Sequence, residues 1–245
     1  MTENKKQPNY LKIVLIIISA VIFFLAVLSV IAFIQKKQTE KNILKLIAES
    51  GYLNNEIVSD NLVSYIKTGL LPKPVITEES PTLGNENAPV TIFEYADFGC
   101  DYSADIQPII TEIMTKYTDQ VKLVWKDLPT ADSNNELLAH LAGRCAQKQN
   151  KFWEYHDKLW ELKKSSSGFN LKNLSAIATE LKLDEKEFSV CLNSEETYRL
   201  ISADVAEADS LLIPATPHFY INNQEIMGQA DLADFEKIID LELNK

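Results

Sequence analysis

The sequence predicts an α/β fold in which two strand-forming regions are separated by a long helical segment. A stretch with helical spacing is flanked by two short runs rich in β-branched and aromatic residues. These runs are Val90–Tyr95 and Val121–Trp125. Such a strand–helix–strand order forms a right-handed parallel unit. From about 135 to 212 the apolar spacing is helical, and a strand at His218–Ile221 follows. We therefore expect one sheet that is covered by helices and interrupted in sequence by a helical insertion.

The N-terminal region is predicted to anchor the chain in a membrane. Ile13–Ile34 contains 22 residues without a charge. As a helix this segment spans about 33 Å, enough for a hydrocarbon core. The apolar region of a cleaved signal peptide is shorter, about 7–15 residues, and ends at a small-residue cleavage site, which we do not find before Gln35. We therefore expect an uncleaved signal-anchor helix at 13–34 behind a cytoplasmic tail at 1–12. Lysines lie on both sides of the anchor, so the positive-inside rule does not decide its orientation.

Between the anchor and the globular domain, residues 35–74 are predicted to form a helical stalk and residues 75–88 a polar linker. Apolar residues recur at helical spacing within the stalk. The sequence Pro72-Lys-Pro74 then ends helical structure. The globular domain is expected at 89–245.

Charge is unevenly distributed along the chain. Residues 1–74 contain nine lysines and five acidic residues, whereas residues 75–245 contain 15 basic and 30 acidic residues. The C-terminal region therefore carries a formal charge of -15. Such an acidic surface argues against binding to nucleic acid and against adhesion to anionic lipid. Its simplest role is to keep the domain soluble.

The elements after the second strand are predicted from helical spacing and turn residues. A turn at Asn222-Asn223 joins the strand at 218–221 to a short strand that reaches Met227. Asp231 is predicted to cap a last helix that runs to about Leu243. The helices expected in the insertion are 135–148, 151–163, 171–181, 185–193 and 195–212.

The first strand leads into a glycine and then into the sequence Cys100-Asp-Tyr-Ser103. This pattern indicates a strand that delivers a thiol to the first turn of a helix, where backbone N–H groups lack partners and the helix dipole favours an anion. A thiol in this place is shifted toward the thiolate, the form that attacks disulfides. Because the fourth residue is a serine, the turn cannot close into an internal disulfide.

Three stretches of the domain carry a family resemblance. Ala88–Cys100 reads APVTIFEYADFGC, Arg144–Asp157 reads RCAQKQNKFWEYHD, and Ala215–Asn222 reads ATPHFYIN. In this order and spacing they resemble the DsbA family of thioredoxin-fold thiol oxidoreductases, over about Ala88 to Leu243. The resemblance implies a thioredoxin fold with an all-helical insertion at about 135–212, preceded by the predicted transmembrane helix and stalk.

The resemblance assigns chemical roles to three residues. Cys100 matches the nucleophilic cysteine of the family, and Ser103 stands where the resolving cysteine usually lies. Glu94, six residues before the nucleophile, matches a buried acid that assists proton transfer and whose pKa rises with burial. The alternative for Glu94 is a solvated acid, or one paired with Lys126 on the neighbouring strand.

Four residues are expected to contact an extended client segment. Pro217 matches the proline that the family holds in cis beside the thiol, with Thr216 before it. A cis bond there aligns the preceding backbone with a client strand. Tyr102 lies within the Cys100 turn, and His218, after the proline, could add a titratable donor near the sulfur. The alternative for His218 is an edge-strand histidine that points to solvent.

Two departures from the family pattern affect the thiol. Asp101 follows the nucleophile, where the family commonly has proline or another uncharged residue, and its negative charge opposes thiolate formation. Ser103 removes the second sulfur, although at helical i, i+3 spacing its hydroxyl can donate a hydrogen bond to the thiolate.

The chain has three cysteines, so one remains unpaired in any arrangement. Some DsbA relatives carry a disulfide within the helical insertion, and the resemblance implies one between Cys145 and Cys191. The alternative is a pair of small buried thiols. One disulfide plus one reactive thiol suits an oxidising compartment. We therefore expect a single-pass protein of the cell membrane whose C-terminal domain is extracytoplasmic.

The sequence leaves three functions open. The first is an enzyme that exchanges thiols and disulfides through Cys100, as an isomerase or reductase rather than a dithiol oxidase. The second is a catalytically inactive thioredoxin-fold module that binds clients. The third is a relative of the kappa-class glutathione transferases, which use a serine near the same helix start.

Partners and cofactors follow from the same residues. We expect cysteine-containing protein clients and a redox partner protein, and no nucleic acid. The three histidines, His140, His156 and His218, lack the spacing of zinc ligands, so no metal site is predicted. No bound cofactor is expected, with glutathione or another small thiol as the co-substrate to consider.

Overall fold

The computed structural model describes residues 22, 24, 25, 27–31, 34, 73–129, 134–165 and 167–245. The chain divides into two units, Met1–Asn54 and Asn55–Lys245. The described residues between 22 and 34 are helical and exposed. No helix among the described residues is long and apolar enough to cross a membrane. Most of the predicted anchor at 13–34, and nearly all of the stalk at 35–74, lie outside those residues.

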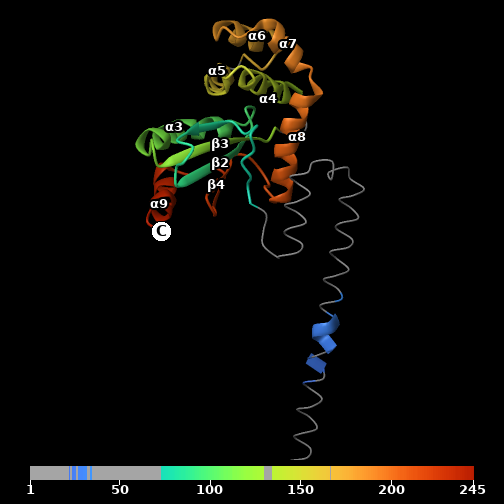
Figure 1. Ribbon diagram of the computed structural model, residues 1–245, viewed down its shortest axis with the longest axis vertical. Coiled ribbons are helices and arrows are strands. Elements are labelled where there is room, and N and C mark those ends of the chain that lie inside the picture. The colour runs from blue at the N-terminus through green and yellow to red at the C-terminus, as the bar shows by residue number, and fades with distance from the viewer. Residues whose placement is uncertain are drawn as a thin grey trace, which may run out of the picture. The chain divides into compact units, whose positions relative to one another are not determined.

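The C-terminal unit is built on a five-stranded mixed sheet with the strand order β1-β3-β2-β4-β5 (Figure 1). Its central pair, β2 and β3, is parallel, and all other neighbouring strands are antiparallel. The strands are β1 (Thr82–Gly84), β2 (Val90–Ala96), β3 (Val121–Asp127), β4 (His218–Ile221) and β5 (Gln224–Met227). Strand β1 lies in the segment predicted to be a linker, where Pro81 and Gly84 obscure a strand of only three residues.

One face of the sheet is covered by α3 (Asp101–Lys116) and α9 (Leu232–Leu243). Because side chains alternate along a strand, Ile92 of β2 and Leu123 of β3 point to this face. They pack in one buried cluster with Ile110 of α3 and Phe235 of α9. The capping box predicted from Asp231 is present at the start of α9.

The opposite face of the sheet packs against α8 (Glu195–Ser210). Phe93 and Tyr95 of β2 point to this side and form a second buried cluster with Ala208 of α8. Lys126 of β3 also points to this side, where it meets acidic residues of α8. The sheet is thus covered on both faces, as the apolar character of β2 and β3 requires.

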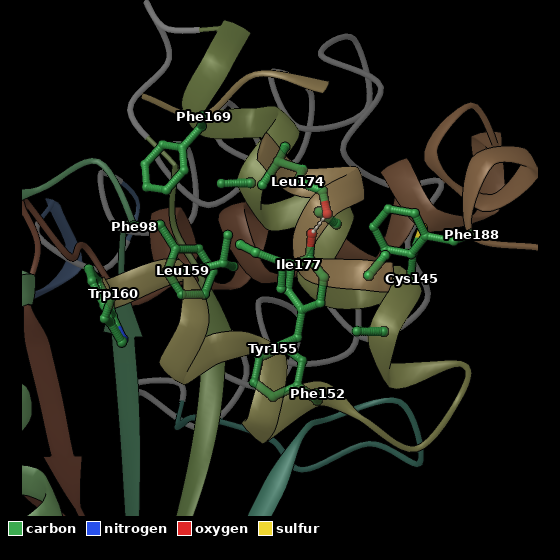
Figure 2. Packing of buried hydrophobic residues seen from close by; sticks show 14 of the residues in the cluster. Phe98, Cys145, Phe152, Tyr155, Leu159, Trp160, Phe169, Leu174, Ile177 and Phe188 are labelled. Atoms are coloured by element: carbon green, nitrogen blue, oxygen red, sulfur yellow. Dashed lines mark hydrogen bonds between the residues drawn. The ribbon is translucent and has the colours of Figure 1, made fainter. Parts of the chain in front are cut away.

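The helical insertion has a core of its own that is continuous with one end of the sheet. It comprises α4 (Asn134–Gln147), α5 (Phe152–Lys164), α6 (Leu171–Glu180) and α7 (Glu185–Leu192), with α8 leading back to the sheet. Figure 2 shows Phe98, from the loop after β2, beside Leu159 and Trp160 of α5. The Phe98 ring also stacks on Trp125 of β3 at a centroid distance of 4.7 Å. The aromatic residues of α5 therefore serve as core.

Candidate active site

Cys100 lies at the junction of β2 and α3, as the sequence predicts. It is the N-cap residue of α3, with extended backbone angles of φ -79° and ψ 125°. Its carbonyl accepts the first helical hydrogen bond, from the N–H of Ala104 at 3.1 Å. The remaining N–H groups of the first turn have no intrahelical partner, and the helix dipole favours negative charge at this end. Cys100 is a free, half-buried cysteine.

The loop before β4 lies beside this thiol. The Thr216–Pro217 peptide bond is cis, and the carbonyl oxygen of Thr216 accepts a hydrogen bond from Cys100 Sγ at 3.4 Å. Pro217 is buried and Thr216 is half-buried. Tyr102, within the Cys100 turn, has 59% of its surface exposed and is accessible to a client. The structure therefore brings Cys100 and the Thr216–Pro217 loop together, and Tyr102 is exposed within the Cys100 turn.

His218 is placed differently from either expectation. Strand β4 lies between β2 and β5, and only 2% of His218 is exposed, so the solvent-facing alternative is wrong. Its ring lies 5.1 Å from that of Tyr220, and its Nε2 lies 3.9 Å from the Glu225 carboxylate. Burial lowers the pKa of His218, and the charge of Glu225 opposes this shift. Among the described residues no hydrogen bond joins His218 to Cys100.

Ser103 occupies the next turn of α3 and is fully buried. Its Oγ makes no hydrogen bond within the described part of the chain, and the Cys100 sulfur donates to the Thr216 carbonyl. The hydroxyl thus makes no hydrogen bond to the sulfur in this structure. Ser103 still fills the place at which a second sulfur would stand.

Glu94 is fully buried beneath α3, so the solvated alternative is wrong. Pairing with Lys126 is also excluded, because Glu94 lies opposite Trp125 in the β2–β3 register and Lys126 points to the other face of the sheet. Gln107 Nε2 donates to Glu94 Oε1 at 2.7 Å and to the Ser103 carbonyl at 3.0 Å. Burial raises the pKa of Glu94 to about 7, and the hydrogen bond from Gln107 opposes this shift only in part.

Lys163 is a charged neighbour of the thiol that sequence reasoning missed. This residue, near the end of α5, places its Nζ 2.9 Å from Asp101 Oδ1 and donates to the Gly99 carbonyl at 2.5 Å. The negative charge of Asp101 is therefore paired. No local sequence pattern predicts this contact, because 62 positions separate Lys163 from Asp101.

Gly99, immediately before the nucleophile, packs closely against the Glu136 side chain of α4. A Cβ built on Gly99 would lie 2.2 Å from the Cγ and Cδ atoms of Glu136. Any larger residue there would displace the Glu136 side chain. Two helices of the insertion, α4 and α5, therefore contact the residue that precedes Cys100.

A buried charge network supports the Cys100 turn from below. The Asp97 carbonyl accepts a hydrogen bond from the Cys100 N–H at 3.0 Å, and Asp97 Oδ1 accepts one from the Gly99 N–H at 2.8 Å. His140 of α4 lies between Asp97 and Asp127, with its Nε2 3.3 Å from Asp97 Oδ1 and its Nδ1 2.6 Å from Asp127 Oδ1. Burial disfavours the charged imidazole, but the two carboxylates outweigh it and raise the pKa of His140 to about 9.

The network continues away from the thiol toward α8 and the N-terminal edge of the domain. Arg144 pairs with both Asp127 and Asp204, and Lys126 lies 3.2 Å from Asp204. Burial by itself would raise the pKa of Asp127, but Arg144 and His140 hold it well below its usual range. The members of the network, in order from the thiol, are Asp97, His140, Asp127, Arg144, Asp204, Lys126 and Glu207. Spacing along the chain does not reveal this network, because its members come from the residue after β2, from β3, and from α4 and α8.

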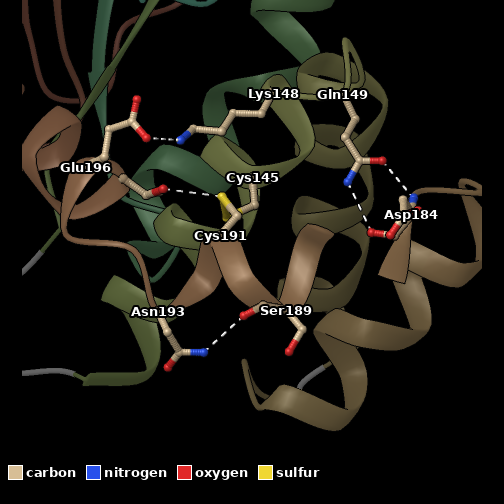
Figure 3. Close-up of a disulfide and its surroundings, with 9 residues drawn as sticks. Cys145, Lys148, Gln149, Asp184, Ser189, Cys191, Asn193 and Glu196 are labelled. Carbon is tan, nitrogen blue, oxygen red and sulfur yellow. Dashed lines mark hydrogen bonds and ion pairs between the residues drawn. A yellow bond between two sulfur atoms is a disulfide. The ribbon is translucent and has the colours of Figure 1, made fainter. Parts of the chain in front are cut away.

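Cys145 and Cys191 form a disulfide between α4 and α7 (Figure 3). Their Cα atoms lie 5.6 Å apart and 46 positions separate them in sequence. The bond is buried within the insertion, where Cys191 Sγ also lies 3.2 Å from Thr197 Oγ1. Cys100 thus has no cysteine partner in its own chain.

A shallow groove of about 340 Å³ runs between the N-terminal half of α3 and the loop before α9. Ile106 and Ile109 form its apolar floor. Its carboxylates come from Asp105, Asp231 and Asp234. The groove begins one turn of α3 beyond Cys100 and lies on the same side of the sheet as Glu94.

Fold and site together define a thioredoxin-fold protein with a helical insertion and one cysteine at the start of its first long helix. The family described as thioredoxin matches residues 76–241. The chain therefore belongs to the thioredoxin family, and its helical insertion makes it DsbA-like.

Relatives of two kinds share this domain. The chain is 28% identical to the probable disulfide bond formation protein D of Bacillus cereus, over 67% of this chain and 79% of that protein. It is 33% identical to the Na(+)/H(+) antiporter NhaA 3 of Salinispora tropica, over 63% of this chain and 23% of the antiporter. The chain thus spans about a quarter of the length of the antiporter relatives that it matches.

Solved structures show the same fold. The oxidised form of BdbD from Bacillus subtilis superposes with a TM-score of 0.60 at 25% identity, covering 69% of this chain and 95% of that one. The thiol-disulfide exchange protein alpha-DsbA2 from Wolbachia pipientis superposes with a TM-score of 0.63 at 19% identity, covering 76% and 96%.

Proposed function

We propose that this chain is a membrane-anchored, extracytoplasmic protein that exchanges thiols and disulfides through Cys100 alone. The observation that carries this proposal is the free thiol of Cys100 at the N-cap of α3, with Ser103 one turn away in place of a second cysteine. Relatives named for disulfide bond formation and for thiol-disulfide exchange support this chemistry.

In the proposed reaction the Cys100 thiolate attacks a disulfide of a client protein. A bond forms between Cys100 and one client sulfur while the client S–S bond breaks, and the other client sulfur leaves as a thiolate. Ser103 cannot resolve this mixed disulfide. A second thiolate, from the client or from a small thiol such as glutathione, must attack the client sulfur and release Cys100.

The source of the second thiolate decides the outcome for the client. When the client supplies it, the disulfide is rearranged without net electron transfer. When two small thiols act in succession, the client disulfide is reduced to two thiols and the small thiols leave joined as a disulfide. Neither route requires a bound cofactor, and the second route gives the small thiol the role of co-substrate.

Glu94 is the proposed proton carrier of this site. Its pKa of about 7 allows it to gain or lose a proton near neutral pH. Gln107 connects it to the backbone of Ser103 in the first turns of α3. We infer from its pKa and its place beneath α3 that the carboxyl accepts and returns the proton that Cys100 loses and regains.

The location and partners of the protein are also proposed. The apolar segment at 13–34 supports an anchor, and a disulfide within the insertion suits an oxidising compartment. We therefore place the domain outside the cytoplasm, with cysteine-containing proteins as clients and a separate protein as the source or sink of electrons.

The test is recovery of activity by a protein with scrambled disulfides, in a buffer containing reduced and oxidised glutathione. We expect the full-length chain to accelerate recovery, Cys100→Ser to abolish the effect, and Ser103→Ala to preserve it. Equal rates for the wild type and Cys100→Ser would instead identify a client-binding module. As a companion, Ser103→Cys should form an internal disulfide with Cys100 and gain dithiol oxidase activity.

The client-binding alternative draws on Asp101, whose charge argues against a reactive thiolate, and on Ser103. The ion pair between Asp101 and Lys163 weakens the first of these arguments, because the charge of Asp101 has a partner. The serine at position 103 argues against a dithiol mechanism, but it is compatible with exchange through a single thiol. The geometry therefore supports exchange better than inert binding.

A further inference from the structure

One ammonium group bridges the two residues that flank the nucleophile. Lys163 Nζ donates to the carbonyl of Gly99, which precedes Cys100, at 2.5 Å, and lies 2.9 Å from the carboxylate of Asp101, which follows it. Lys163 belongs to α5, in the helical insertion, whereas Gly99 and Asp101 belong to the β2–α3 junction. The insertion thus supplies a charge to the thiol site of the thioredoxin fold.

The exposure of the two partners indicates which of them is held in place. The Lys163 side chain is 25% exposed, whereas that of Asp101 is 85% exposed. The ammonium is therefore the more enclosed partner of this ion pair, and it also donates to the Gly99 carbonyl. An exposed ion pair of this kind contributes little to folding. Its effect on the ionisation of Cys100, which lies between Gly99 and Asp101 in the sequence, is a separate matter, because charges on neighbouring groups interact even near a protein surface.

We propose that Lys163 is a positioning residue for thiol exchange. Its ammonium, which donates to the Gly99 carbonyl, cancels the charge of Asp101 so that the Cys100 thiolate can form. The proposal rests on the proposed function, because it explains how a site with an acid beside its nucleophile stays reactive. Its readout, the ionisation of Cys100, does not depend on turnover of any client.

Other ionisable groups also surround the turn and stay unchanged in the test. Glu136 of α4 packs against Gly99, and Asp97 and His140 lie beneath the turn. Glu94 lies under α3, and His218 follows the Thr216–Pro217 loop. Their contribution is common to all variants that differ only at Lys163 and Asp101.

The experiment measures the rate of Cys100 alkylation by iodoacetamide against pH, with the full-length chain in detergent and the Cys145–Cys191 disulfide intact. We expect Lys163→Gln to slow alkylation about threefold at neutral pH and to move the profile to higher pH, as one uncompensated surface charge would. Lys163→Arg should retain the wild-type profile. The matched control is Lys164→Gln, the next residue of α5, which is exposed and should leave the profile unchanged.

The decisive variant combines Lys163→Gln with Asp101→Asn. Because the local charge returns to that of the wild type, the double variant should recover the wild-type profile. A profile of Lys163→Gln equal to that of Lys164→Gln would overturn the proposal. A slowed profile that Asp101→Asn does not restore would overturn it as well, since loop displacement alone would then explain the effect. If the profiles behave as expected while scrambled protein is not rearranged, the proposed function fails and the role of Lys163 in thiol ionisation stands.

Discussion

Glu94 shows at the scale of one residue how this fold tolerates a costly group near its thiol. Its side chain is fully buried, and only one of its two carboxylate oxygens accepts a hydrogen bond among the described residues. A carboxylate in such a place costs folding free energy whenever it is ionised. The cost is consistent with a role in moving protons rather than in holding the sheet together.

Replacing Glu94 with glutamine should therefore stabilise the protein at alkaline pH. The pKa of Glu94 is raised from 4.5 to about 7 on folding, so its penalty grows as pH rises from 4.5 to 7 and is constant above. At about pH 8 we expect Glu94→Gln to raise the free energy of unfolding by about 1–3 kcal/mol, with the gain fading in acid. Urea unfolding of the wild type and of Glu94→Gln at about pH 8 and in acid measures this difference in stability. Glu112→Gln, at an exposed position, is the control. Equal stability of wild type and Glu94→Gln at alkaline pH would contradict the assignment.

At this scale the sequence located the Cys100 turn, because the strand before it and the helical spacing after it are local patterns. The roles of Ser103 and Glu94 came from the family resemblance, which left open whether Glu94 is buried. Lys163 and Gln107 could not be predicted in the same way. The contact of Lys163 depends on the register of a helix in the insertion, and that of Gln107 on which face of α3 meets β2.

Helix α4 is the element that fastens the insertion to the sheet. His140 and Arg144, four residues apart and thus on one side of the helix, both contact Asp127 at the end of β3. Cys145, one position later, is bonded to α7. One helix therefore connects the end of the parallel strand pair, the Cys100 turn and the far side of the insertion.

The contact between α4 and β3 should make stability depend on pH. The pKa of His140 is raised to about 9 on folding, so its contribution is complete below its ordinary pKa of 6.5 and is lost as pH rises through 9. We expect the free energy of unfolding to fall by about 2–3 kcal/mol over this range. His140→Gln should flatten the dependence above about pH 8, where Glu94, with its pKa of about 7, is mostly ionised. Urea unfolding curves across this range measure it, and a variant with the same slope as wild type would refute the role of His140.

The disulfide between α4 and α7 should contribute to stability independently of the thiol site. It closes a loop of 46 positions, which corresponds to about 3–4 kcal/mol in the chain-entropy account. The double variant Cys145→Ala/Cys191→Ala should lose about this much free energy of unfolding, while the alkylation profile of Cys100 stays the same. If non-reducing mass spectrometry of the wild type finds two free thiols at these positions, the disulfide assignment is wrong.

At the scale of elements, the long amphipathic helices and the central strands were predictable because their apolar periodicity is strong. Strand β1 was not, since three exposed residues carry no periodic signal and the pairing with β3 decides their conformation. The pairing of β4 with β5 was predicted from the turn at Asn222-Asn223. The pairing of β4 with β2 on its other side was not, and the two pairings together place His218 in the interior rather than at an edge.

For the whole molecule, the proposed topology places a strongly acidic domain outside the cell membrane. Protease added to intact cells that express the full-length chain should therefore remove the domain at 89–245 and leave a tag at the N-terminus protected. A cytoplasmic protein that stays intact is the control. Protection of the domain until the membrane is permeabilised would refute the extracytoplasmic assignment. The acidic surface should also keep the domain from binding anionic lipid vesicles.

The buried Ser103 has a consequence for how long a captured client stays bound. In a two-cysteine site the second sulfur ends the covalent complex at a rate that belongs to the protein. This chain has no intramolecular thiol that can resolve the complex. When the client also lacks a further thiol, the lifetime of the complex is therefore set by the concentration of free thiol in the surroundings. Occupancy of Cys100 would therefore rise when the compartment becomes poor in thiols and fall when it becomes rich. The domain would thus register the thiol content of its compartment in the fraction of its molecules that carry a client.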